Sequence, residues 1–220
     1  TLDDNYNQSL AQLGFVVINF AYRGSGPWRG RDFHTFGYGN LRDYALADDM
    51  AAIRQIAARY PCADIERVGI YGHSGGGFMT VAAMLNHPEF YKVGVAASGN
   101  HDNNIYSQWW GETFHGVKQT WGKDGKPHFE CHIPTNIELA DRLAGRLLLI
   151  TGDMDNNVHP ASTARLADAL IRARKRFDMT VIPGADHGLG NSYYVNLIRY
   201  YFTEHLLGLP QQEIDIVKHN

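Results

Sequence analysis

The chain has 220 residues, of which 44% are hydrophobic and 20% charged, so it is long enough for one well-cored domain. Its formal net charge is −3 and its acidic and basic residues are interspersed, which gives no electrostatic case for binding nucleic acid or an anionic membrane. No apolar run approaches the roughly 20 residues of a membrane-spanning helix. Two cysteines, Cys62 and Cys131, are too few for a disulfide framework, and their pairing stays open.

Short apolar segments typical of strands alternate with amphipathic segments typical of helices. The expected strands are at residues 14–20, 68–71, 91–97, 146–151 and 179–183. A helical pattern occupies residues 5–13, and apolar helical stripes recur on Leu46, Met50, Ile53 and Ala57, on Leu166, Ala169, Leu170 and Ala173, and on Tyr194, Ile198, Tyr201 and Phe202. This alternation predicts an α/β fold with a mostly parallel sheet that is covered by helices on both faces.

The sequence GHSGG at residues 72–76 follows the second expected strand and precedes an apolar stretch typical of a helix. A strand, the pattern G-x-S-x-G and a helix, in that order, form a nucleophile elbow, which exposes the serine hydroxyl on a tight and strained turn. We expect Gly72 and Gly76 to be required because larger residues would not clear the turn. Ser74 is therefore the candidate nucleophile. The N–H of Gly75, at the start of the helix, is the candidate oxyanion donor.

Candidates for an acid and a base follow the ends of later strands, in the chain order serine, acid, histidine. Asp155 comes shortly after the fourth expected strand, and His187 follows the fifth. The carboxyl ends of parallel strands share one edge of a sheet, where catalytic groups of open α/β sheets gather. A serine hydroxyl needs an imidazole to accept its proton and a carboxylate to hold that imidazole. His187 is the candidate base and Asp155 the candidate acid, while spacing leaves Asp153 and Asp186 open as alternatives.

Residues 100–141 interrupt the alternation, because the segment is rich in His, Asn, Trp and Gly and has no sustained period. We interpret it as an inserted lid or a substrate-facing excursion. Within it, His128, Cys131 and His132 offer metal-ligating atoms, but zinc sites usually need four ligands in two spaced pairs, and no partner pair is present. We therefore expect no metal and no other cofactor.

Four motifs together make the chain resemble the catalytic domain of the prolyl oligopeptidase family, with the dipeptidyl peptidase IV branch as the closest match. They are YRGSG at residues 22–26, GHSGGG at 72–77, GDMDNNVH at 152–159 and ADHG at 185–188. The resemblance runs over nearly the whole chain. It implies an α/β-hydrolase fold that lacks its first strands, with Ser74 as nucleophile, Asp155 as acid and His187 as base.

The resemblance also implies an activity, which is hydrolysis of peptide bonds after proline, alanine or another small residue through an acyl-enzyme. The implied pocket for the residue before the scissile bond consists of Tyr106, Trp110, Asn157 and Val158. Asn103 departs from the branch, which usually carries a tryptophan at that place.

Members of the family carry an upstream β-propeller, so the resemblance implies that residues 1–220 are the catalytic core of a longer chain. We expect this core to be weakly active alone, because the second oxyanion donor comes from a loop upstream of it. An open sheet edge would favour association, with a homodimer as one form. The resemblance suggests a periplasmic or secreted location, and the sequence leaves a cytoplasmic one open.

Two other functions stay open at this point. An esterase would use the same triad on small acyl esters, because one nucleophile and oxyanion chemistry serves both kinds of bond. A hydrolase-shaped interaction domain would have no use for the chemistry, and the presence of all three triad residues argues against it.

Overall fold

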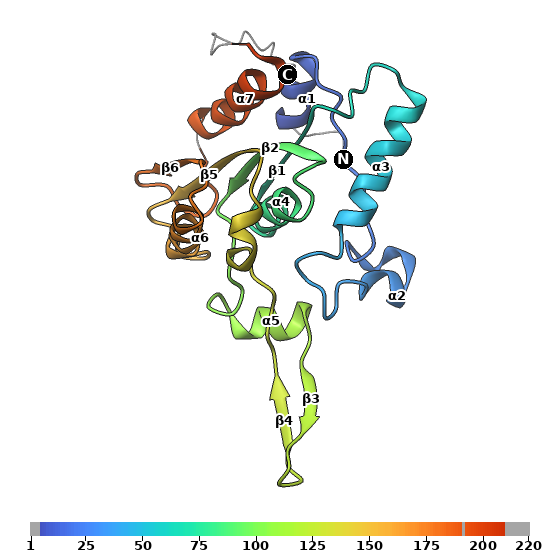
Figure 1. Ribbon diagram of the computed structural model, residues 1–220, viewed down its shortest axis with the longest axis vertical. Coiled ribbons are helices and arrows are strands. Elements are labelled where there is room, and N and C mark those ends of the chain that lie inside the picture. Colours follow the sequence, from blue (N-terminus) through green and yellow to red (C-terminus); the bar gives the residue numbers. More distant parts are fainter. Residues whose placement is uncertain (1–4, 191, 210–220) are drawn as a thin grey trace.

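The computed structural model describes residues 5–190 and 192–209, and its centre is a parallel sheet (Figure 1). The four strands lie in the order β1-β2-β5-β6 and all pairs are parallel. They are β1 (Val68–His73), β2 (Tyr91–Ala97), β5 (Arg146–Gly152) and β6 (Asp178–Ile182). Each agrees with an expected strand to within two residues at either end.

Helices cover both faces of this sheet, as the alternation of the sequence predicts (Figure 1). One face carries α3 (Leu46–Arg59), α4 (Gly75–Asn86) and α6 (Ala161–Arg172), and the other carries α1 (Asn5–Gln12) and α7 (Ser192–Leu207). Side chains of the inner strand β2 alternate between the two cores: Ala96 packs on the α4 side, whereas Val95 and Ala97 pack on the α7 side. Two short helices, η1 (Pro27–Arg29) and α2 (Arg31–His34), precede α3. In the described part of the chain, no helix has the length and apolar character needed to cross a membrane.

The expected strand at residues 14–20 is wrong, because this segment pairs with no strand of the described chain. A cavity of about 370 Å³ lies between the segment and β1, and both line it. The backbone hydrogen bonds that would pair this segment with β1 are absent from the described chain, so it stays outside the sheet. The segment is nevertheless partly buried, since Phe15 packs edge-on against Phe202 of α7 with ring centroids 6.2 Å apart. Its apolar pattern reflects burial and not strand pairing.

The excursion at residues 100–141 has secondary structure of its own. It contains α5 (Gln108–Phe114), the antiparallel pair β3 (Lys118–Trp121) and β4 (Pro127–Glu130), and η2 (Ile137–Arg142). The hairpin projects away from the body of the molecule (Figure 1). Its register places Gln119 opposite Phe129 and Trp121 opposite Pro127, so these four residues share one face. Trp121 and Phe129 are 70% and 67% exposed, so this aromatic face is not packed on the sheet.

Two asparagine side chains close the base of the excursion. Asn104 exchanges two hydrogen bonds of 2.8 Å with the backbone of Ile133. The backbone N–H of Asn136 donates to the His101 carbonyl at 3.1 Å. The side-chain Nδ2 of Asn136 donates to the Phe78 carbonyl in α4 at 2.9 Å and to His101 Nδ1 at 3.2 Å. The two ends of the excursion are thereby tied to each other and to α4.

The burial of His101 predicts that the protein loses stability in mild acid. Its side chain is fully buried and no described group pairs with Nε2, and burial lowers the pKa of His101 from 6.5 to about 3. The unfolded chain binds a proton here near pH 6.5, whereas the folded chain does so only near pH 3. The contribution to stability is complete above the unfolded pKa and is lost as the pH falls toward the folded one. Between about pH 7.5 and about pH 5, the free energy of unfolding should fall by about 2 kcal/mol through this residue.

Urea unfolding of the wild type and of His101→Gln at both pH values measures this effect. Glutamine does not titrate, so the fall between the two pH values should be smaller in the variant by about the same 2 kcal/mol. This difference is independent of how much the substitution itself costs, since each protein is compared with itself. Equal falls in the two proteins would contradict the prediction.

Candidate active site

Ser74 occupies the turn between β1 and α4, at the carboxyl edge of the sheet. Its φ of 59° and ψ of −122° form a strained combination for a residue that has a Cβ. The turn is tight, because a Cβ added at Gly72 would lie 2.4 Å from the carbonyl carbon of Gly76. A Cβ added at Gly76 would meet no atom within 4 Å apart from the neighbouring backbone of its own helix. The requirement for glycine therefore applies to Gly72, and its extension to Gly76 is wrong.

The imidazole of His187 lies between Ser74 and Asp155. His187 follows β6, and its Nε2 is 2.9 Å from Ser74 Oγ while its Nδ1 is 2.8 Å from Asp155 Oδ2. An ionised carboxylate only accepts hydrogen bonds, so Nδ1 carries the proton, and Nε2 accepts from the Ser74 hydroxyl in the neutral ring. The structure thus brings together three residues that are far apart in the sequence, in an orientation that leaves Nε2 free to take a proton.

Asp155 is held in place from the loop that follows β5. Its side chain is fully buried, and its Oδ1 accepts the backbone N–H groups of Asn157 at 3.0 Å and Val158 at 2.9 Å. One carboxylate oxygen is therefore occupied by the backbone and the other faces His187. This arrangement fixes which oxygen the imidazole meets.

The two alternative acids make other contacts. Asp153 is exposed, and its Oδ1 accepts the N–H of Gly184 at 2.6 Å. The Oδ1 of Asp186 accepts the N–H of Gly188 at 3.0 Å, which closes a local turn beside His187. Asp155 is the one of the three carboxylates that contacts the His187 ring.

Gly75 is the first residue of α4, directly after Ser74. The first helical hydrogen bond to the elbow is the one that the Phe78 N–H donates to the Ser74 carbonyl, at 3.0 Å. The N–H groups before Phe78 have no acceptor within the helix, and the positive end of the helix dipole lies at the same place. An anion that forms next to Ser74 Oγ would meet such a donor at Gly75.

The residues expected to form a side-chain pocket are only partly gathered around one space. A cavity of about 210 Å³ is lined by Tyr106, Asn157 and Val158, and the Tyr106 hydroxyl donates to Asn157 Oδ1 at 2.6 Å. Neither Trp110 nor Ser74 lines this cavity. The Trp110 ring instead packs edge-on against Tyr106, with ring centroids 5.7 Å apart. The other lining residues are Asp102, Ile105, His159, Ala161 and Ser162.

Two residues at the site are absent from the predictions made from sequence. The Asp102 carboxylate is almost buried beside the cavity and accepts a charged hydrogen bond from Arg165 Nη2 at 3.2 Å. No motif or spacing in the sequence indicates Asp102 as a residue of the site. His73 contacts His187 directly, and its only signal in the sequence is its position next to Ser74.

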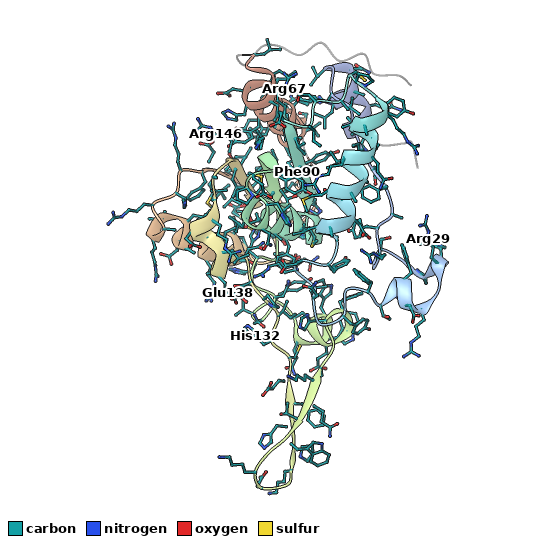
Figure 2. The ribbon with its side chains drawn as sticks, turned by 45° about the vertical axis from the view of Figure 1, so that its right-hand side comes forward. Arg29, Arg67, Phe90, His132, Glu138 and Arg146 are labelled. Atoms are coloured by element: carbon teal, nitrogen blue, oxygen red, sulfur yellow. The ribbon has the colours of Figure 1, made fainter. Side chains whose placement is uncertain are left out.

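The histidines and cysteine of the excursion take other partners. His132 lies close to Glu138, with Nε2 and Oε1 3.7 Å apart (Figure 2). His128 Nε2 is 3.7 Å from Asp124 Oδ1, and Cys131, like Cys62, is a free thiol. Within residues 5–190 and 192–209, no group of three or more His, Cys, Asp or Glu could hold a metal ion. The absence of a metal stays a prediction.

A family model, curated proteins and solved structures are similar to this chain. A model of the prolyl oligopeptidase family matches residues 2–209. Dipeptidyl peptidase 8 of Homo sapiens is 29% identical over 198 residues, which cover 87% of this chain and 22% of that protein. The crystal structure of Porphyromonas gingivalis dipeptidyl peptidase 4 matches with a TM-score of 0.71 at 28% identity, over 84% of this chain and 26% of that one. The fold is therefore the α/β-hydrolase fold expected from the sequence, and the chain spans about a fifth of the length of the curated relatives that it matches.

Proposed function

Because this chain belongs to the prolyl oligopeptidase family, we propose that it is the catalytic part of a serine peptidase that cleaves after proline, alanine or another small residue. The observation that supports this proposal most is the hydrogen-bond chain from Ser74 through His187 to Asp155, with distances of 2.9 and 2.8 Å. Both similar proteins named above are dipeptidyl peptidases by name. The proposed substrate is a peptide, and the proposed chemistry needs no cofactor.

In the first half of the reaction, Ser74 Oγ attacks the carbonyl carbon of the scissile bond. His187 Nε2 takes the hydroxyl proton as the new C–O bond forms, and Asp155 stabilises the resulting imidazolium. The carbonyl oxygen gains a negative charge and is stabilised by the Gly75 N–H. When the C–N bond breaks, Nε2 gives its proton to the departing amine, which leaves an acyl group on Ser74.

In the second half, water takes the place of the amine. His187 removes a proton from the water as its oxygen attacks the acyl carbon, and returns that proton to Ser74 Oγ when the ester bond breaks. The product is a free carboxylate, and the enzyme regains its starting protonation. The same cycle would hydrolyse an ester, which keeps an acyl hydrolase as the second candidate function.

Two walls of the cavity support an apolar side chain before the scissile bond. The cavity measures about 210 Å³, and Tyr106 and Val158 contribute aromatic and aliphatic walls. Trp110 would act on this pocket through its contact with the Tyr106 ring. Asn157, whose Oδ1 accepts from Tyr106, would fix the direction of that ring. A proline or alanine side chain would bury its methylene or methyl groups against these walls.

We expect amide substrates with proline before the scissile bond to be cleaved at least about 10-fold faster, by kcat/KM, than the matching leucine substrates. A hydrophobic pocket discriminates side chains by roughly 1–3 kcal/mol per misfit group, which corresponds to this range. Chromogenic Ala-Pro and Ala-Leu anilides measure the ratio, and a nitrophenyl acetate ester serves as a control for nucleophile reactivity. A burst with the ester but no cleavage of either anilide would indicate the esterase instead.

Two further proposals concern the whole protein. The prolyl oligopeptidase family resemblance suggests that an upstream β-propeller accompanies this domain, which the relative lengths of similar proteins support. The outer edge of β1 carries no paired strand in the described chain, and an open edge of this kind favours association, with a homodimer as one form.

A further inference from the structure

His73 is the last residue of β1 and directly precedes Ser74. Both residues contact His187. Its Nε2 lies 2.6 Å from the backbone carbonyl oxygen of His187. The two imidazole rings are 4.7 Å apart, centroid to centroid, at an interplanar angle of 54°. Neither the side-chain pocket nor the hydrogen-bond chain of the triad includes His73.

The His187 carbonyl determines which ring nitrogen of His73 carries a proton. A carbonyl oxygen accepts hydrogen bonds and cannot donate them, so Nε2 of His73 must carry the hydrogen. The Ser98 hydroxyl lies 3.4 Å from the same carbonyl, which makes it a longer and weaker second donor. His73 therefore supplies the short hydrogen bond that ties the His187 backbone to the end of β1.

Two consecutive residues thus hold two different parts of His187. Ser74 meets the imidazole at Nε2, while His73 holds the backbone carbonyl. The His187 segment follows β6, whereas His73 belongs to β1, and these strands are at opposite edges of the sheet. Without the His73 bond, the long hydrogen bond from Ser98, at 3.4 Å, would be the side-chain contact left to the His187 carbonyl among the described residues.

We propose that His73 is a positioning residue, which holds the His187 backbone and ring so that Nε2 stays within proton-transfer distance of Ser74 Oγ. This inference rests on the proposed function, because it assigns a role to His73 only if His187 is the base. His73 does not touch the substrate in this proposal. Its effect belongs to the chemical step, where a displacement of about 1 Å can cost on the order of 100-fold in rate.

Two substitutions separate the donor from the ring. His73→Phe keeps a flat ring of similar size against His187 but removes the N–H donor. His73→Gln removes the ring but offers an amide N–H at a reach similar to that of Nε2. We expect His73→Phe to lower kcat on the Ala-Pro anilide by about 10- to 100-fold with KM changed less than about 3-fold. We expect His73→Gln to recover most of the lost rate. The rate of Ser74 labelling by a fluorophosphonate should follow the same order.

His205→Phe is the matched control, since His205 also packs against an aromatic ring, that of Tyr201 in α7, with centroids 4.4 Å apart. If His73→Phe does not fold, as judged by its thermal unfolding midpoint, His73→Met tests the loss of the donor in its place. The proposal is overturned if the donor-free variant reacts like the wild type, if His73→Gln is as slow as it, or if KM rises while kcat is kept. A wild type whose Ser74 is never labelled would instead overturn the proposed function, and this inference with it.

Discussion

Ser74→Ala is expected to lower turnover on the order of a million-fold and to abolish covalent labelling by a fluorophosphonate. The Ser74 hydroxyl is the group that meets His187 Nε2, at 2.9 Å, and alanine leaves that nitrogen without a proton to take. The Gly75 N–H and the substrate pocket would remain, so the residual rate would come from binding and oxyanion stabilisation alone. Labelling followed by mass spectrometry of the tryptic peptide measures the covalent step directly, even where peptide turnover is slow.

Ser192→Ala is the matched control, because Ser192 is an exposed serine at the start of α7 and is not part of the elbow at residues 72–76. Its labelling rate should equal that of the wild type. Labelling that persists in Ser74→Ala would remove Ser74 as the nucleophile and, with it, the proposed reaction.

The positions of the candidate catalytic residues could be predicted because each follows a strand whose ends the sequence marks clearly. Ser74, Asp155 and His187 come after β1, β5 and β6, and parallel strands bring such positions to one edge of the sheet. The choice of Asp155 over Asp153 could not be made from spacing. It depends on which carboxylate the backbone of Asn157 and Val158 turns inward, a contact between near neighbours that no periodicity records.

Two elements of the fold were not predicted correctly, because an apolar pattern reports burial and not strand pairing. Residues 14–20 are as apolar as a buried strand, and Phe15 is in fact packed against α7, but an apolar pattern reports burial and carries no information about a hydrogen-bonding partner. The hairpin of β3 and β4 is the opposite case. It was not predicted, because its aromatic face is exposed and leaves no alternating burial to detect. The one signal was the Asp-Gly pair at residues 124–125, which is typical of a hairpin turn.

The residues that line the cavity could be predicted only in part from residue type. Tyr106, Asn157 and Val158 line one cavity, whereas Trp110 packs against the Tyr106 ring and does not line it. Trp110 lies in α5 and Tyr106 in the turn before it, and so irregular a segment gives no period from which to calculate which ring faces the cavity. Asp102, buried and paired with Arg165, lines the same cavity and adds a charge that the sequence did not suggest.

Asp155→Asn is expected to lower turnover by about 10,000-fold through the wrong tautomer of His187. The backbone N–H groups of Asn157 and Val158 donate to Oδ1 of Asp155, so they would select the amide oxygen of the new asparagine at that position. The amide nitrogen must then face His187 Nδ1, where the carboxylate Oδ2 now lies at 2.8 Å. An N–H donor at this place forces Nδ1 to accept, which moves the ring proton to Nε2. Nε2 can then no longer take the proton of Ser74.

Asp153→Asn makes the same chemical change two residues away and should cost less than about 3-fold, because surface changes that keep their contacts have small effects. Asp153 is exposed, and its Oδ1 only accepts the N–H of Gly184, a role that an amide oxygen fills equally well. The kcat values of the two variants on one anilide substrate, with KM measured alongside, give the comparison. If Asp153→Asn were the more damaging change, the buried hydrogen bonds around Asp155 would be structural only, and the acid that orients His187 would have to be reassigned.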